Sequence, residues 1–74
     1  SRPQFFRVFK QEMGITPVEL VNKERVRYAK RILLQSRDIT QACFEAGFNS
    51  LSYFHRTFKK EERKTPMMWL EENG

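Results

Sequence analysis

The sequence lacks the cysteines, histidines and long apolar runs on which several classes of protein depend. Its single cysteine, Cys43, cannot form an intramolecular disulfide, and one cysteine with one histidine cannot supply the ligands of a zinc site. No apolar run approaches the ~18 residues that a membrane-spanning helix requires, and no signal-peptide pattern begins the sequence. We therefore expect a cytoplasmic protein in a reducing environment, with no metal, no other cofactor and no membrane partner.

Groups that could catalyse a reaction are also missing. The sequence has no glycine-rich phosphate loop and no pair of carboxylates spaced for acid–base work, and His55 has no carboxylate or nucleophile placed to act with it. Cys43 falls among apolar residues, as expected of a small buried side chain rather than a redox centre. These absences argue against an enzyme.

What the sequence does contain is an excess of positive charge. Lysine and arginine number 14 against 9 acidic residues, which gives a net charge of +5 and an isoelectric point near 9.8. Such an excess favours polyanionic partners, above all nucleic acid. With 74 residues, the chain can form one small domain with a modest core.

The sequence also contains an internal repeat. Residues 1–17 recur as residues 50–66 without a gap, and the match includes the phrases FKQEMGITP and FKKEERKTP. A match of this length indicates a duplicated structural unit. The recurring residues are Ser1, Phe5, Arg7, Phe9, Lys10, Glu12, Thr16 and Pro17, which return as Ser50, Phe54, Arg56, Phe58, Lys59, Glu61, Thr65 and Pro66.

Capping signals divide the first half of the sequence into two helices. Ser1 can cap a helix that ends at Gly14, and Thr16 followed by Pro17 can begin a second helix that runs to about Gln35. The second helix has an apolar stripe with a basic flank beside it. The stripe comprises Leu20, Val21, Val26, Ala29, Ile32, Leu33 and Leu34, and the flank comprises Arg25, Arg27, Lys30 and Arg31.

Shorter helices follow in the second half. Asp38 can cap a third helix and Ser50 a fourth, and a brief terminal helix follows Pro66. Between the third and fourth helices, Gly47 permits a tight turn and Phe48 can plug it. A short helix, a glycine turn and a second capped helix form the outline of a helix-turn-helix. Because strand alternation and hairpin dipeptides are absent throughout, we expect an all-α fold.

The two repeated helices have opposite chemistry on their two sides. At helical spacing the phenylalanines share the inward side, and an arginine and a lysine lie about half a turn away. An arginine at this position does not contribute to a hydrophobic core. In the major groove, however, its guanidinium can form hydrogen bonds to both O6 and N7 of a guanine. The inward residues are Phe5, Phe9, Phe54 and Phe58, and the outward residues are Pro3, Phe6, Arg7, Lys10, Ser52, His55, Arg56 and Lys59.

A long helix joins the two copies. Over residues 17–35 it would be about 28 Å long, against the ~34 Å between successive major grooves on one face of DNA. We therefore expect a spacer that places both repeated helices in adjacent major grooves.

The residues resemble those of the AraC/XylS family of bacterial transcription regulators over essentially the whole chain. The matching residues are Phe9, Lys10, Glu12, Gly14, Thr16, Pro17, Arg25, Ala29, Leu33, Leu34, Ile39, Gly47, Phe48, Ser52, Tyr53, Phe54, Arg56, Phe58, Lys59, Lys60, Thr65 and Pro66.

The resemblance implies homeodomain-like tandem helix-turn-helix units joined by a long linker helix. By this resemblance, residues 1–14 are the recognition helix of a first unit that lacks its two preceding helices. Residues 16–36 are the linker helix, and residues 38–74 are a complete second unit with a C-terminal helix. The resemblance also implies binding to asymmetric double-stranded promoter DNA, an effector or dimerisation domain outside this chain, and RNA polymerase as a further candidate partner. One departure from the family pattern is Arg63, which stands where Gly14 has its counterpart.

The resemblance also assigns roles to residues. The residues expected to contact bases are Arg2, Pro3, Gln4, Arg7, Leu51, Ser52, Tyr53, His55 and Arg56. Those expected to contact phosphates are Ser1, Lys10, Arg25, Ser50 and Lys59. The alternative is a helical module that binds proteins and is basic for solubility; in that case the arginines are ordinary solvated charges.

Overall fold

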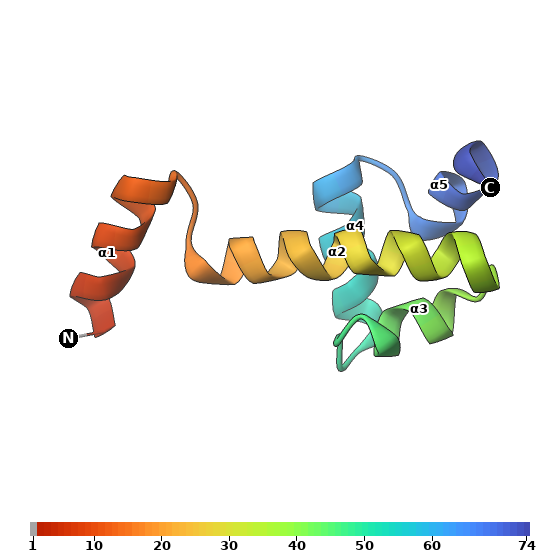
Figure 1. Ribbon diagram of the computed structural model, residues 1–74, viewed down its shortest axis with the longest axis horizontal. Helices are drawn as coiled ribbons and strands as arrows, with labels where there is room; N and C mark the ends of the chain where they lie inside the picture. The colour runs from red at the N-terminus through yellow and green to blue at the C-terminus, as the bar shows by residue number, and fades with distance from the viewer. Residues whose placement is uncertain (1) are drawn as a thin grey trace.

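The computed structural model describes the backbone of residues 2–74 and the side chains of residues 5–74. Over this range the chain forms helices and no strand, which confirms the expected all-α fold (Figure 1). The helices are α1 (Arg2–Met13), α2 (Pro17–Ser36), α3 (Ile39–Glu45), α4 (Leu51–Glu62) and α5 (Pro66–Asn73).

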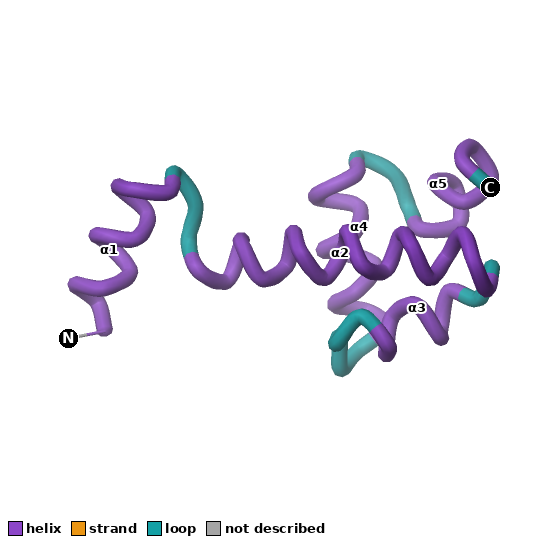
Figure 2. The backbone as a smooth tube through the Cα atoms, in the orientation of Figure 1, coloured by secondary structure: helices purple, strands orange, loops and turns teal. Residues whose placement is uncertain are grey.

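The long helix α2 is the axis around which the others are arranged. Helices α3 and α5 lie beside its C-terminal half, and α4 crosses behind its middle (Figures 1 and 2). Helix α1 stands apart at the N-terminal end of α2, so that the chain extends over 42 Å in its longest dimension and only 21 and 18 Å in the others. Three loops and turns separate the four helices of the compact part, and one loop leads to α1 (Figure 2).

One hydrophobic core joins α2, α3, α4 and α5. Apolar area removed from water stabilises such a core by about 25 cal/mol per Å². Aromatic rings form its centre: the ring centroids of Phe48 and Phe54 are 5.0 Å apart, and those of Phe54 and Phe58 are 5.7 Å apart. The buried apolar residues are Val26, Ala29, Ile32, Leu33, Ala42, Cys43, Ala46, Phe48, Phe54, Phe58 and Leu70.

Only part of the apolar stripe of α2 is buried in the core. Val26, Ala29, Ile32 and Leu33 are buried as expected, because α3, α4 and α5 pack against this half of the helix. Val21 and Leu34 were expected in the same stripe and are instead about half exposed. Val21 precedes the part of α2 that α3 covers, and Leu34 lies on a different side of the helix from Leu33.

The repeat is confirmed in three dimensions, element by element. Helices α1 and α4 begin and end at equivalent positions of the repeat, as do the starts of α2 and α5 at Pro17 and Pro66. The caps are equivalent too: the Thr16 hydroxyl accepts a hydrogen bond from the Glu19 amide at 3.1 Å, and the Thr65 hydroxyl accepts one from the Met68 amide at 3.2 Å. Ser1, the expected cap of α1, lies outside the described residues.

The residue that ends the helix differs between the two copies of the repeat. Gly14 follows α1 with a φ of +79°, and at the equivalent position after α4 Arg63 has a φ of +66°. A left-handed conformation is nearly free for glycine and costs other residues about 1–2 kcal/mol. Helix α4 therefore ends in the same geometry as α1, but with a strained residue.

The environment of the paired phenylalanines also differs. Phe54 is fully buried, whereas its counterpart Phe5 is 57% exposed and Val8 is about half exposed. The expected inward side of α1 is therefore only partly covered: Phe9 is half-buried, and Phe5 is exposed. The physical reason is that α3 and the Phe48 turn cover the apolar side of α4, and no element of the described chain covers that of α1 (Figure 1).

Helix α2 is continuous, but α4 does not lie at its C-terminal end. Contacts of α4 reach α2 at Asn22, Lys23 and Lys30, so α4 lies across the middle of α2 rather than at its end. The expectation that the full helix acts as the spacer is therefore wrong. The separation is set by the first turns of α2 together with the Gly14–Thr16 loop.

We predict that Arg63→Gly raises the free energy of unfolding by about 0.5–1 kcal/mol, because glycine adopts the left-handed conformation without strain. Urea unfolding monitored by the fluorescence of Trp69, the single tryptophan of the sequence, measures this change. Arg63→Ala is the control, since it removes the same side chain and keeps the Cβ atom. If alanine stabilises as much as glycine, the backbone strain is not the cause.

Candidate nucleic-acid interface

The two sides of α4 are sharply different. Phe54, Thr57 and Phe58 are buried on one side, and the basic residues lie on the opposite side in solvent. The Ser50 hydroxyl caps the helix by accepting a hydrogen bond from the Tyr53 amide at 3.3 Å. The residues expected to contact DNA from this helix are all exposed, and Lys60, which was not assigned a role from the sequence, is exposed beside them: Ser50, Leu51, Ser52, Tyr53, His55, Arg56, Lys59 and Lys60.

A chain of contacts runs from α2 to the guanidinium of Arg56. The Asn22 side-chain amide donates a hydrogen bond to the Tyr53 hydroxyl at 2.8 Å, and Cζ of Arg56 lies 5.9 Å from the centre of the Tyr53 ring. A cation at this distance is attracted by the face of the ring. The linker helix thereby restricts Tyr53, and Tyr53 in turn restricts the arginine at the centre of the exposed side.

Arg25 reaches from α2 to the turn between α3 and α4. Its Cζ lies 6.0 Å from the centre of the buried Phe48 ring. A Cβ atom placed on Gly47 would lie 3.3 Å from Nε of Arg25, and Gly47 has a φ of +97°. Glycine at this position therefore serves both the left-handed turn and the approach of the arginine. No ion pair of Arg25 is recorded within residues 5–74, so its charge has no acidic partner there.

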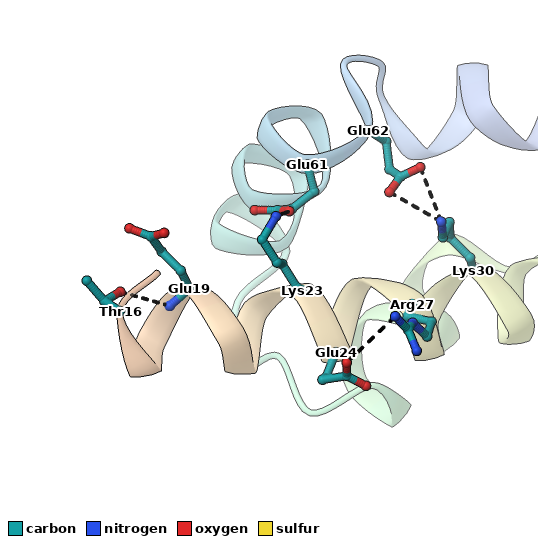
Figure 3. Close-up of polar contacts among 8 residues, drawn as sticks. All are labelled: Thr16, Glu19, Lys23, Glu24, Arg27, Lys30, Glu61 and Glu62. Carbon is teal, nitrogen blue, oxygen red and sulfur yellow. Dashed lines mark hydrogen bonds and ion pairs between the residues drawn. The ribbon is translucent and has the colours of Figure 1, made fainter. Parts of the chain in front are cut away.

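Ion pairs fix α4 across α2 (Figure 3). Nζ of Lys23 lies 2.8 Å from a carboxylate oxygen of Glu61, and Nζ of Lys30 lies 3.3 Å from one of Glu62. Lys30 also lies 5.9 Å from the centre of the Trp69 ring. These pairs join residues more than thirty positions apart in sequence, so periodicity gave no signal for them.

The Lys23 pair has an electrostatic consequence. The hydrogen bond to the Glu61 carboxylate, and then its negative charge, raise the pKa of Lys23 above the ordinary value of 10.5. By contrast the Arg27 and Glu24 pair, at 3.9 Å, lies on the exposed surface of α2 and contributes little. In the core, burial raises the pKa of the Cys43 thiol, which favours its neutral form.

Shallow grooves of mixed charge lie between α4 and the first half of α2. The larger, of about 530 Å³, is lined by Ile15, Glu19, Lys23, Lys59, Lys60, Glu61 and Arg63. Lys59, Lys60 and Arg63 thus form a basic rim along the C-terminal half of α4. Arg63, like Lys60, was not assigned a role from the sequence.

On α1 the expected outward residues Arg7 and Lys10 are exposed. The backbone of Arg2, Pro3 and Gln4 belongs to the helix, and their side chains lie outside the described part, as does all of Ser1. In the view of Figure 1, α1 and α4 both run from bottom to top. The structure therefore presents two exposed arginine-bearing helices on one chain.

Residues 5–74, the described part of the chain, offer neither a metal site nor a membrane-spanning helix. Over that range no cluster of histidine, cysteine and acidic side chains could hold a metal ion. None of the helices described is long and apolar enough to cross a membrane.

Comparison with known proteins identifies the class. A family model described as "Helix-turn-helix domain" matches residues 1–72. The xylose operon regulatory protein of Haemophilus influenzae is 36% identical over 70 residues, which cover 89% of this chain and 17% of that protein. The transcriptional regulator MtrA of Neisseria gonorrhoeae is 29% identical over 75 residues, covering all of this chain and 25% of that protein.

A solved structure agrees with the fold. A protein of unknown function from Listeria innocua superposes with a TM-score of 0.85 and 33% identity, over 96% of this chain and 69% of that one. The chain is thus a helix-turn-helix domain. It belongs to the AraC/XylS-type family, and it spans about a quarter or less of the two regulators named above.

We predict that Lys23→Gln lowers the free energy of unfolding, because it removes the cation from Glu61. Since the folded-state pKa of Lys23 is raised, this stabilisation is fully present below pH 10.5 and is lost as the pH rises through the raised value. Urea unfolding of both proteins at increasing pH measures the difference, which should also shrink with added salt. Lys59→Gln is the control, because no ion pair of Lys59 is recorded within residues 5–74. Equal, pH-independent effects of the two substitutions would contradict the role of the pair.

Proposed function

We propose that the chain binds double-stranded promoter DNA in a sequence-specific manner, as part of a cytoplasmic transcription regulator, with α1 and α4 reading adjacent major grooves. One observation carries the proposal: Arg56 and Lys59 are exposed on the side of α4 opposite the buried Phe54 and Phe58. An arginine and a lysine, Arg7 and Lys10, are exposed at the equivalent positions of α1. Burial of an aromatic side in the core leaves the basic side free for a ligand, and the spacing of the basic residues suits a groove lined by phosphates.

The roles of individual residues follow from their chemistry. Arg7 and Arg56 each bond O6 and N7 of a guanine. Other base contacts come from the remaining exposed residues of the two helices, namely Arg2, Pro3 and Gln4 on α1 and Leu51, Ser52, Tyr53 and His55 on α4. Phosphate contacts come from Ser1, Lys10, Arg25, Ser50 and Lys59, to which the basic rim adds Lys60 and Arg63.

Arg25 is the best supported of the phosphate contacts. Its guanidinium lies against the turn that leads into α4, with no acidic partner recorded within residues 5–74. The backbone amides of the first turn of α4 lie at this same N-terminal end of the helix, and helix N-termini favour negatively charged groups. A phosphate on the strand beside the start of α4 would meet both.

The first helix-turn-helix unit differs from the second in how much of it this chain contains. Residues 38–74 form a complete unit with the linker helix, residues 16–36, whereas residues 1–14 supply only a recognition helix with an uncovered apolar side. We propose that helices preceding residue 1 cover Phe5 and Val8 as α3 covers α4. An effector-binding or dimerisation domain and contacts with RNA polymerase would lie outside this chain.

The exposed apolar side of α1 also favours a second candidate, a helical module that binds another protein. Phe5 is 57% exposed, and an exposed apolar side is typical of a protein contact. This contact and DNA binding by the opposite side of α1 are compatible. The two functions differ in their dependence on salt.

We predict that affinity for duplex DNA falls steeply with salt, at a slope in log–log form near −0.9 for each phosphate neutralised. A titration of labelled duplex at several salt concentrations measures the slope. Substituting both Lys59 and Lys60 by alanine should make the slope shallower by about two units. A slope that is flat for the unsubstituted protein would favour the protein-binding module.

We predict that Arg56→Ala and Lys59→Ala have different effects on specificity. Loss of the guanidinium should remove about 1–3 kcal/mol of discrimination at one base position, whereas loss of the lysine should weaken binding about equally for all sequences. Affinities for a panel of operator variants, each with one position changed, separate these outcomes. Identical profiles for the two variants would refute the division into base and phosphate contacts.

A further inference from the structure

A hydrogen bond within α4 fixes the position of a proton on His55. Nδ1 of His55 lies 2.7 Å from the carbonyl oxygen of Leu51, one turn earlier in the helix. A carbonyl oxygen can only accept a hydrogen bond, so Nδ1 must donate it. The neutral imidazole therefore has its one proton on Nδ1 and none on Nε2.

A second contact holds the ring in place. Phe54, which is fully buried, meets the imidazole edge-on, with ring centroids 5.7 Å apart and an angle of 75° between the planes. The ring is thus anchored at Nδ1 and supported along one edge. His55 itself is exposed, and no partner of Nε2 is recorded within residues 5–74. A ring held in this way presents the same atom at the same place to any ligand of α4.

An unprotonated Nε2 can only accept a hydrogen bond. In the major groove the donors are the exocyclic amino groups at N4 of cytosine and N6 of adenine, whereas guanine and thymine present acceptors. We propose that His55 determines specificity by accepting a hydrogen bond from such an amino group, and so selects cytosine or adenine at one position of the operator. This inference rests on the proposed function.

The neighbouring residue has the opposite chemistry. Arg56 has donors and no acceptor, so His55 and Arg56 together present an acceptor beside a donor on consecutive residues. A guanine for Arg56 and a cytosine or adenine for His55 satisfy both. The sequence of α1 does not repeat this pair, because Phe6 precedes Arg7. The two recognition helices would therefore share a preference for guanine and differ at the position that His55 reads.

The experiment begins with selection of bound sites from a random duplex library by the intact protein. Affinities are then measured for all four bases at each position, in one buffer at a single pH. His55→Ala should lose about five- to tenfold of preference at one position whose preferred base is cytosine or adenine. His55→Lys replaces the acceptor by a donor and should shift that position toward guanine or thymine.

Two controls complete the design. Lys59→Ala should leave the preference at that position unchanged while lowering affinity overall. Replacing the preferred cytosine by 2-pyrimidinone, or adenine by purine, deletes only the amino group. The unsubstituted protein should lose about as much affinity as it does through His55→Ala. His55→Ala should lose nothing beyond the cost of the weakened base pair, which thermal melting of the two free duplexes measures.

Three results would overturn the inference while leaving the proposed function intact: no position responds to His55→Ala, the responding position prefers guanine or thymine, or affinity falls equally for all sequences. A selection that enriches no sequence would contradict the proposed function as well.

Discussion

The burial of Phe54 and Phe58 is the interaction on which the rest of the structure depends. Both rings are fully buried in the core that α2 shares with α3, α4 and α5, and the Phe54 ring contacts both Phe48 and Phe58. Because a helix turns once in 3.6 residues, burying these positions forces Ser52, Arg56 and Lys59 to the opposite side. The exposed basic side is therefore a consequence of the core, and a change in the core would rotate or release it.

Helix α2 turns this local constraint into a defined orientation. It supplies the apolar surface under α4, and it also supplies Asn22, Lys23 and Lys30, whose contacts prevent α4 from rotating about its own axis. Arg25 holds the turn before α4 through Gly47 and Phe48. The individual polar contacts are weak because they are partly exposed, so the rings determine that α4 docks and the polar contacts determine at which angle.

Local signals in the sequence predicted the elements well. Thr16, Asp38 and Ser50 each form the cap expected of them, and the repeat located α4 and the start of α5, because capping and helix periodicity depend on neighbouring residues only. Features that depend on docking could not be predicted in this way. The crossing of α4 at the middle of α2 brings distant segments together, as do the pairs of Asn22 with Tyr53 and of Lys23 with Glu61. For the interface, the sequence correctly indicated which residues of α4 are exposed, but periodicity cannot show that Tyr53 is held from α2 or that Leu51 fixes the His55 proton.

We propose that α1 and α4 are two copies of one DNA-reading helix, held so that both enter the major groove at the same time. The most direct measurement places a photo-reactive group at position 7 or position 56 of the intact protein and maps the cross-linked bases on a selected duplex. The account predicts two separate cross-linked segments in the major groove on one face of the duplex, about 10 base pairs apart. Cross-links from both positions to the same segment, or from neither position to any base, would contradict it.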